Sequence, residues 1–255
     1  MMRPLVLDAA MGTRLIARGL DLTRDDPSLW NLDRPEAVAE IHRLDLDAGA
    51  DAITTNTFGA NRKWLARYGR AGDVVAINRQ AASIARTLAG PDRIVLGCIG
   101  PTAPGTEDEL EQARALADEG VDALLLETNA TAEPIGGRLR RLHAAVGLPM
   151  IVTFALVADD DPLPGLDFDP DEVGLRAIGW NCIPPDRAVT LPGRLRRPVD
   201  VPLVLRPSGG AWEAEVPRLL DRGVRYFGGC CGTTEADVGA LRRAIGPRRS
   251  ASESG

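Results

Sequence analysis

The chain has 255 residues, of which 44% are hydrophobic and 26% are charged, and its formal net charge at pH 7 is -6. This length fits a single α/β barrel, and the apolar share is that of a globular protein with a buried core. The negative balance argues against a nucleic-acid partner, because phosphate binding needs a concentrated basic surface. The basic stretches 138–141 and 194–197 are short, and we interpret them as solvated helix or loop faces.

The N-terminal sequence has an apolar run of only a few residues before Asp8, which is too short for a signal-peptide core. No later segment approaches the roughly 20 apolar residues of a membrane-spanning helix. We therefore expect a cytoplasmic protein with no membrane partner, whose four cysteines are thiols or metal ligands rather than disulfides. Segment 247–255 is expected to be a disordered tail, and the sequence carries no signal for an oligomeric state.

Short apolar runs alternate with helical patterns along the chain. The runs are typical of strands buried on both faces, and they cover residues 4–7, 52–55, 94–97, 123–126, 150–154, 177–180, 203–205 and 226–229. Helices are predicted at residues 35–48, 73–89, 107–119, 132–146, 213–222 and 235–245. Eight strand-then-helix units predict a single (β/α)8 TIM barrel over residues 1–246, with short fifth and sixth helices. No G-x-G-x-x-G motif follows the first run to indicate a dinucleotide-binding sheet.

In such a barrel the functional side chains lie at the carboxyl ends of the strands. The sequence places at those ends Asp8, Asn56, Cys98, Glu127, Thr153, Cys182, Ser208, Cys230 and Cys231. All four cysteines are therefore at strand ends, where chance would put several in helices.

Lysine and histidine chemistry has no candidate residue. Lys63, the only lysine, falls in a helical region and not at a strand end, where a Schiff base would form. His42 and His143 are the only histidines, and both sit in amphipathic helical patterns, where we expect surface or boundary positions. Histidine-driven acid–base catalysis is therefore not predicted.

Three of the cysteines predict a metal site. Cys182 ends the sixth strand and the pair Cys230–Cys231 ends the eighth, so their sulfurs can converge across the barrel mouth. A soft tetrahedral cation such as zinc takes three thiolates and leaves one position for a substrate. Successive strand residues face opposite ways, so both members of the pair reach one ion only if the backbone turns sharply. The glycines of the GGCCG sequence permit that turn.

Other interpretations of these cysteines stay open. The vicinal pair could be a strained disulfide, a redox switch or two small buried residues, and Cys182 alone could be a buried thiol. Cys98 is expected to be a packed small hydrophobe, because a fourth thiolate would close the site. A zinc ion on three thiolates would accept a substrate thiol and lower its pKa, which suits a chain without a candidate base.

Six motifs follow one another over nearly the whole chain. They are LDAAMGT (7–13), AGADAITTNTFGAN (48–61), GCIGPT (97–102), GVDALLLET (120–128), IGWNC (178–182) and GGCCGTTEADV (228–238). The last is specific, and together they resemble the homocysteine S-methyltransferase family. That family includes betaine- and S-methylmethionine-dependent enzymes and the homocysteine domain of cobalamin-dependent methionine synthase. The resemblance implies zinc as the cofactor, with Cys182, Cys230 and Cys231 as its ligands.

The same resemblance implies a substrate pocket around homocysteine. Glu127 matches the carboxylate that holds the substrate amino group, with Asp8 beside it, and two carboxylates are good charge-assisted partners for an ammonium. The backbone amides after Asp8, beginning with that of Ala9, resemble the family's site for the substrate carboxylate. Asn56 and Thr57 are expected to shape the pocket floor.

The sequence departs from the family pattern in three ways. Ala9 stands where the family has glycine and would be strained if the backbone needs a positive φ there. Trp180 replaces a smaller residue and is expected to narrow the mouth. The βα loops are shortened before Glu109 and around residues 159–171 and 209–213, which is the side where a methyl donor would be held.

The resemblance implies zinc-dependent transfer of a methyl group to the thiol of homocysteine, forming methionine, from S-methylmethionine or a similar onium donor. The shortened loops favour an alternative, a homocysteine-activating subunit that takes the methyl group from a corrinoid or other protein partner. A third interpretation, supported by Ala9 and the short loops, is a non-catalytic zinc-binding barrel.

Overall fold

A computed structural model describes residues 2–102, 106–129, 135–155, 168–194 and 200–247. The predicted tail 247–255 lies outside the described residues apart from Pro247. Within the described part of the chain, no helix has the length and apolar character needed to cross a membrane.

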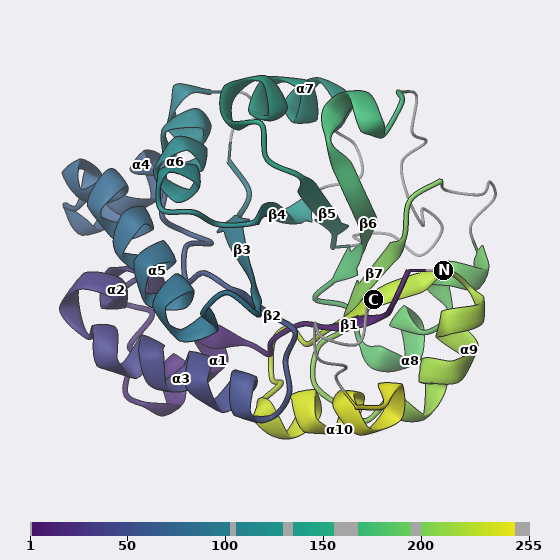
Figure 1. The fold of residues 1–255 in the computed structure, drawn as a ribbon. Coiled ribbons are helices and arrows are strands. Elements are labelled where there is room, and N and C mark those ends of the chain that lie inside the picture. The colour runs from purple at the N-terminus through teal and green to yellow at the C-terminus, as the bar shows by residue number, and fades with distance from the viewer. Residues whose placement is uncertain (1, 103–105, 130–134, 156–167, 195–199, 248–255) are drawn as a thin grey trace.

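Eight parallel strands pair in the order β1-β8-β7-β6-β5-β4-β3-β2, and a bridge between Leu7 and Ala52 joins the two ends of that order. The strands are β1 (Leu5–Val6), β2 (Ala52–Thr54), β3 (Ile94–Ile99), β4 (Ala123–Asn129), β5 (Met150–Phe154), β6 (Leu175–Asn181), β7 (Leu203–Arg206) and β8 (Val224–Phe227). They surround a common axis in Figure 1, which confirms the predicted TIM barrel.

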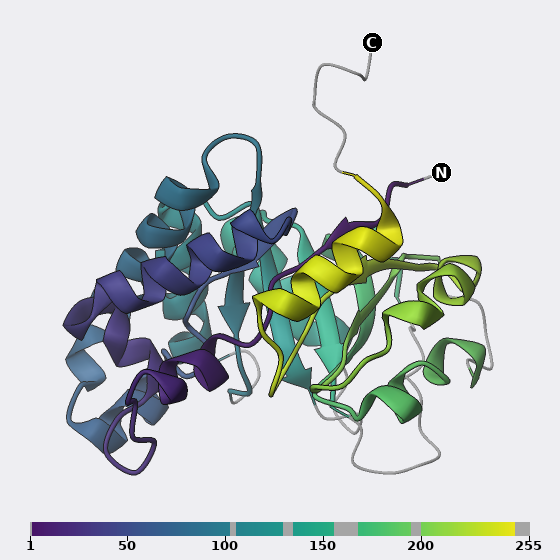
Figure 2. The same ribbon diagram turned by 90° about the horizontal axis from the view of Figure 1, so that it is seen from below.

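Helices form a ring outside the strands (Figure 1). They are α1 (Met11–Ala17), α2 (Trp30–Asp33), α3 (Pro35–Asp47), α4 (Arg62–Leu65), α5 (Val74–Ala89), α6 (Glu107–Asp118), α7 (Ile135–Val146), α8 (Pro185–Ala188), α9 (Val216–Asp221) and α10 (Glu235–Ile245). The predicted bounds of α3, α5, α6 and α10 are correct to within one residue at each end. The start of β1 and the end of α10 lie at the same face of the barrel in Figure 2.

Two β/α units are reduced, as the sequence predicted. Between β5 and β6, the described residues contain only the 3-10 turn Asp171–Val173. Between β6 and β7, the single-turn α8 is followed by the 3-10 turn Leu191–Arg194. The shortened segment 159–171 lies mostly outside the described residues. Among the described residues, the units on either side of β6 thus contain less helix than the units that follow β2 and β3.

The barrel interior has an apolar layer below a polar one. The apolar layer consists of Leu7, Ala52, Leu96, Ala123, Leu125, Ile151, Ala177 and Val204. Because strand residues alternate between faces, the next inward positions toward the carboxyl ends are Thr54, Cys98, Glu127, Thr153, Gly179 and Arg206, and Asn181 follows Gly179 on β6. The alternation that closes the core thus also brings five polar side chains to the cavity at the barrel mouth, namely Thr54, Cys98, Glu127, Asn181 and Arg206.

Trp180 does not narrow the mouth, contrary to the sequence-based expectation. It lies between two inward positions of β6, so its ring points outward into the core between barrel and helices. There it is fully buried in one cluster with Phe154 and Ile178. Its large ring packs in the core between the barrel and the helices, and Trp180 does not line the cavity at the barrel mouth.

Two polar residues that were expected near the surface are buried. Arg138 of α7 is 4% exposed because its Nε donates to Glu109 Oε1 of α6 at 2.6 Å, and its guanidinium also contacts Asn129. His42 of α3 is fully buried because α1 and α2 pack over that helix. Neither ring nitrogen of His42 has a hydrogen-bond partner among the described residues.

We predict that His42 makes the protein less stable in mild acid. Burial lowers the pKa of His42 from 6.5 to about 4, so between these values the unfolded chain binds a proton that the native chain does not. Stability therefore falls as the pH falls from the upper value to the lower, by about 3 kcal/mol in total.

Urea unfolding at pH 7 and pH 4.5 tests this effect. The variant His42→Leu is expected to lose less stability over this interval than the wild type. His143→Leu, which removes a half-buried histidine, is the matched control. Equal losses in the wild type and in His42→Leu would contradict the assignment.

Candidate functional site

A cavity of about 320 Å³ opens at the carboxyl ends of the strands, where a barrel places its functional residues. Its wall contains every residue that the sequence assigned to metal or substrate, namely Asp8, Ala9, Asn56, Glu127, Cys182, Cys230 and Cys231. Cys98 also lines this cavity. Closure of the barrel thus gathers residues that are up to 223 positions apart, Asp8 and Cys231, into one pocket.

The three predicted metal ligands converge at one wall of this cavity. The Sγ atoms of Cys182 and Cys231 are 3.5 Å apart, and all three sulfurs lie within 4.8 Å of one another. A tetrahedral zinc ion with Zn–S bonds of about 2.3 Å needs sulfur–sulfur separations of about 3.8 Å. All the cysteines are free thiols, so the vicinal pair is not a disulfide. The geometry fits one ion held by three thiolates.

Cys182 reaches the cavity through a left-handed backbone. It follows Asn181, which faces the barrel interior, so a continued strand would turn Cys182 outward. Its φ is 58°, a value that non-glycine residues rarely adopt. Its N–H donates to the carbonyl of Arg206 at 3.1 Å, which ties the turn to β7. Residues in such conformations cluster at functional sites, and each costs about 1–3 kcal/mol.

The pair Cys230–Cys231 is presented by a tight turn after β8. The Thr233 hydroxyl and N–H donate to the carbonyl of Cys230 at 2.6 and 3.1 Å. A Cβ on Gly229 would lie 2.2 Å from Thr233 Oγ1, and Gly232 has φ 82°. Only glycine tolerates both conditions. The positive φ of Gly232 agrees with its predicted role in the turn, whereas Gly229 leaves the space that the Thr233 side chain occupies.

The polar surroundings of the sulfurs favour a thiolate at Cys182. Hydrogen bonds from Cys230, Cys231 and the Ser208 hydroxyl lower the pKa of Cys182, although its partial burial opposes this change. The thiols that donate to Cys182 hold their protons more tightly, and the pKa values of Cys230 and Cys231 are raised. A thiolate with two thiols around it is a favourable place for a soft cation.

Asn181 links the sulfur cluster to the strand that carries Glu127. Its Oδ1 accepts from the N–H of Thr128 at 3.1 Å, and its Nδ2 donates to Thr128 Oγ1 at 2.9 Å. The same Nδ2 lies 3.9 Å from Cys230 Sγ. Thr128 has φ 60°, so the amide of Asn181 secures a second left-handed residue, at the end of β4. Sequence reasoning missed this contact. The available signal was the strand alternation, which places Asn181 on the same inward face of β6 as Ala177 and Gly179.

The two predicted substrate carboxylates are joined by a buried arginine that sequence reasoning also missed. Arg206 Nη1 donates to Glu127 Oε1 at 2.7 Å, and Nη2 donates to Asp8 Oδ1 at 3.0 Å. Arg206 is 4% exposed, and the opposing carboxylates raise its pKa although burial acts in the other direction. The available signal was a charged residue two positions after Val204, within the seventh strand.

Glu127 lies between Arg206 and a buried thiol. Cys98 is 2% exposed, as its prediction as a packed residue requires, and its Sγ donates to Glu127 Oε2 at 3.2 Å. Burial raises the pKa of Glu127, while the positive charge of Arg206 acts against that rise. Cys98 is therefore both part of the core and a hydrogen-bond partner of the carboxylate.

The remaining predicted residues form the rest of the wall. Among the described residues, Ala9 is not one of the non-glycine positions with positive φ, so its Cβ causes no strain. The N–H of Ala10 donates to Thr233 Oγ1 at 3.1 Å, which fixes the segment after β1. Asn56 Nδ2 donates to the carbonyl of Pro27 at 2.7 Å and holds that loop against the cavity.

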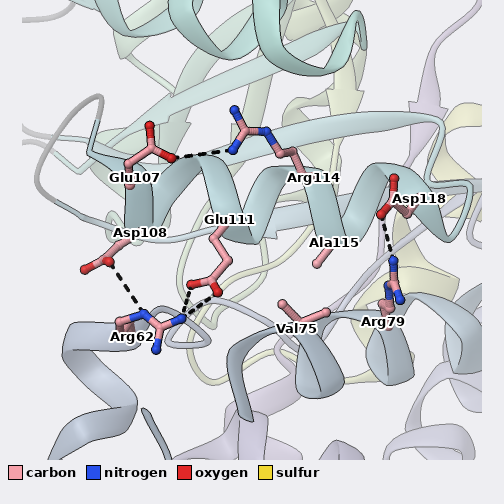
Figure 3. Close-up of a pocket in the computed structure, with 9 residues that line it drawn as sticks. All are labelled: Arg62, Val75, Arg79, Glu107, Asp108, Glu111, Arg114, Ala115 and Asp118. Carbon is pink, nitrogen blue, oxygen red and sulfur yellow. Dashed lines mark hydrogen bonds and ion pairs between the residues drawn. The ribbon is translucent and has the colours of Figure 1, made fainter. Parts of the chain in front are cut away.

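A second hollow, of about 450 Å³, lies between α5 and α6 (Figure 3). Three arginines and four carboxylates dominate its lining: Arg62, Arg79, Arg114, Glu107, Asp108, Glu111 and Asp118. Ion pairs already join them, such as Arg62–Glu111 at 2.5 Å and Arg79–Asp118 at 2.8 Å. Partly exposed pairs of this kind contribute little energy, and the residues of this hollow are not among the described groups that could hold a metal ion. The chemistry lies at the barrel mouth.

A parallel TIM barrel with three converging thiols and two carboxylates at the carboxyl ends of its strands has the architecture of a barrel enzyme. Residues 5–245 match the sequence model of the homocysteine S-methyltransferase family. Methionine synthase of Mycobacterium tuberculosis is 31% identical in an alignment that covers 95% of this chain and 25% of that protein. Homocysteine S-methyltransferase of Escherichia coli is 27% identical in an alignment that covers 93% of this chain and 94% of that enzyme.

The chain therefore belongs to the homocysteine S-methyltransferase family. The crystal structure of the metallated homocysteine methyltransferase MmuM from Escherichia coli shares its fold, with a TM-score of 0.77 at 24% identity over 95% of this chain and 96% of that one. The chain spans about a quarter of the length of the mycobacterial methionine synthases that it matches.

We predict that Asn181 stabilises the left-handed turn at Thr128. Asn181→Leu keeps the shape of the side chain but leaves the N–H of Thr128 without its acceptor, at an expected loss of about 2–3 kcal/mol in unfolding free energy. Thr128→Val removes only the hydroxyl contact and should lose about 1 kcal/mol. Urea unfolding of both variants measures the difference, and an Asn181→Leu protein as stable as the wild type would refute it.

Proposed function

We propose that this protein transfers a methyl group to the thiol of homocysteine and forms methionine, with zinc held by Cys182, Cys230 and Cys231. The observation that carries the proposal is the meeting of these three sulfurs, within 4.8 Å of one another, in the pocket that also contains Glu127. Membership of the homocysteine S-methyltransferase family supports the acceptor, and the free, converging thiols support the metal.

When bound, zinc would lower the pKa of the acceptor thiol and so supply a thiolate nucleophile at neutral pH. The chain's own residues position the reactants. Ser208 and Asn181 orient the ligand sulfurs through hydrogen bonds to Cys182 and Cys230. Such supporting contacts fix ligand geometry and strengthen metal binding.

Glu127 is the proposed partner of the homocysteine ammonium. Its side chain is 12% exposed and faces the cavity, whereas the side chain of Asp8 is 3% exposed. Asp8 Oδ2 accepts from the N–H of Thr54 at 2.6 Å, so Asp8 acts on the substrate mainly by holding its surroundings. The segment that begins at Ala9 also lines the cavity, and its backbone amides are the proposed site of the substrate carboxylate.

The methyl transfer is proposed as an in-line displacement from an onium donor such as S-methylmethionine. The homocysteine sulfur forms a bond to the methyl carbon while the bond from that carbon to the positively charged donor atom breaks. The donor leaves as a neutral thioether, and the thiol proton passes to solvent. The protein accelerates this step by positioning the two reactants.

A second candidate takes the methyl group from a corrinoid or other protein partner. The observation that favours it is the match to methionine synthases over a quarter of their length. The third interpretation, a non-catalytic barrel, loses one of its two supports, because Ala9 is accommodated without a positive φ. Methionine formed from homocysteine and S-methylmethionine without any added protein favours the onium donor over the protein donor.

We predict one zinc ion per chain and its loss in Cys231→Ala, because two thiolates cannot replace three in a tetrahedral site. Cys98→Ala is the matched control and should keep its zinc. Elemental analysis of both purified variants measures the stoichiometry. Zinc retained by Cys231→Ala to the wild-type level would overturn the ligand set.

We predict that Glu127→Ala raises the KM for homocysteine by about 10- to 100-fold, because a charge-assisted hydrogen bond to the ammonium is lost. Zinc content should stay at the wild-type level, since Glu127 is outside the sulfur cluster. Steady-state kinetics with varied homocysteine test this role. Unchanged kinetics in a zinc-loaded variant would remove Glu127 from the substrate site.

A further inference from the structure

Arg206 crosses the barrel mouth and forms part of the cavity wall. From the end of β7 its Nε donates to the carbonyl of Gly229 at 3.2 Å, and its two terminal nitrogens reach Asp8 on the far side of β8 and Glu127 on β4. One planar guanidinium thereby joins four strands or their ends. A fork of this kind fixes both carboxylates in a way that a lysine could not.

Gly228 lies beside Arg206. A Cβ on Gly228 would collide with Leu7 Cβ at 2.8 Å and would contact Arg206 Nε at 3.4 Å, so the glycine fits closely between the two residues. Arg206 itself is 4% exposed. The hydrogen bonds of Arg206 are therefore buried at the barrel mouth and are not surface contacts.

Asp8 and Glu127 differ in their number of hydrogen-bond donors and in their access to the cavity. Asp8 Oδ1 accepts from Arg206 and from Thr54 Oγ1 at 2.8 Å, while its Oδ2 accepts from the N–H of Thr54. Asp8 thus has three donors on a side chain that is 3% exposed. Glu127 receives Arg206 on one oxygen and the Cys98 thiol on the other, and it keeps access to the cavity.

Arg206 also changes the net charge of the pocket near Asp8 and Glu127. Asp8 and Glu127 would give the substrate end of the pocket two negative charges, and Arg206 reduces the sum to one. An ammonium therefore gains less from this pocket than from two unpaired carboxylates, and a substrate carboxylate is repelled less. The recognition of the acceptor's amino group then depends on Glu127 alone.

We infer that Arg206 is a specificity residue for the thiol acceptor: by engaging Asp8 and one oxygen of Glu127, it opens the site to small thiol carboxylates with or without an α-amino group. This inference rests on the proposed function, since it concerns the thiol that the sulfur-held metal would bind. It assigns to Arg206 the choice between acceptors, and not the binding of metal or the methyl transfer itself.

The direct test compares two ligands on the zinc-loaded wild-type protein by calorimetry. The ligands are L-homocysteine and 4-mercaptobutanoate, which is homocysteine without its amino group. If the amino group forms a single charged hydrogen bond, homocysteine should bind less than about 100-fold more tightly than 4-mercaptobutanoate. If two carboxylates were available to the amino group, the ratio of affinities would be larger. A preference for homocysteine below this limit is expected, and one above it would overturn the inference.

Two variants show whether Arg206 causes this selectivity. Arg206→Met frees both carboxylates and should raise the preference for homocysteine at least about tenfold, with tighter homocysteine binding and weaker 4-mercaptobutanoate binding. Arg206→Lys keeps one positive charge. Its preference for homocysteine over 4-mercaptobutanoate should lie between that of the wild type and that of Arg206→Met. If Arg206 has only a structural role, its replacement should weaken the binding of homocysteine and of 4-mercaptobutanoate by similar factors. That outcome contradicts the inference.

The outcomes separate this inference from the proposed function. Failure of the zinc-loaded wild type to bind either thiol defeats the proposed function and the inference with it. Homocysteine binding with strong rejection of 4-mercaptobutanoate leaves the proposed function intact and defeats only the role of Arg206. If Arg206→Met does not fold, the wild type and Arg206→Lys still decide the question.

Discussion

The site depends on one backbone constraint, the left-handed conformation of Cys182 at the end of β6. A strand that simply continued past Asn181 would send the Cys182 sulfur toward the helices, away from Cys231. The N–H of Cys182 ties this turn to β7, and the amide of the preceding Asn181 is tied to the left-handed Thr128 of β4. Local strain is thus offset by contacts from neighbouring strands, and three sulfurs meet as a result.

A second layer of organisation is electrostatic. The cavity at the barrel mouth contains the three-cysteine cluster, in which hydrogen bonds lower the pKa of Cys182, and the Asp8–Arg206–Glu127 group. An apolar core lies below both groups. Burial makes each unpaired charge costly, so the carboxylates and the arginine depend on one another. One cavity therefore combines sulfur ligands with a carboxylate–arginine group, which suits the proposed amino-acid thiol.

Much of this could be predicted from sequence, because the signals were periodic or local. Buried apolar runs and capping residues such as Thr234 fixed the strands and helices, and the glycines around Cys230 indicated the turn after β8. Arg206 could not be found in this way, because a long side chain acts on partners in other strands. The burial of His42 and Arg138 depends on which helices pack over them, and helical periodicity does not record that.

Zinc K-edge X-ray absorption tests the central claim most directly, because it counts the sulfur atoms around the ion. The zinc-loaded protein should show three sulfurs at about 2.3 Å, and a fourth should appear when homocysteine is added. Fewer than three sulfurs in the protein alone, or an unchanged sulfur count with homocysteine present, would contradict a thiol-accepting centre built from Cys182, Cys230 and Cys231.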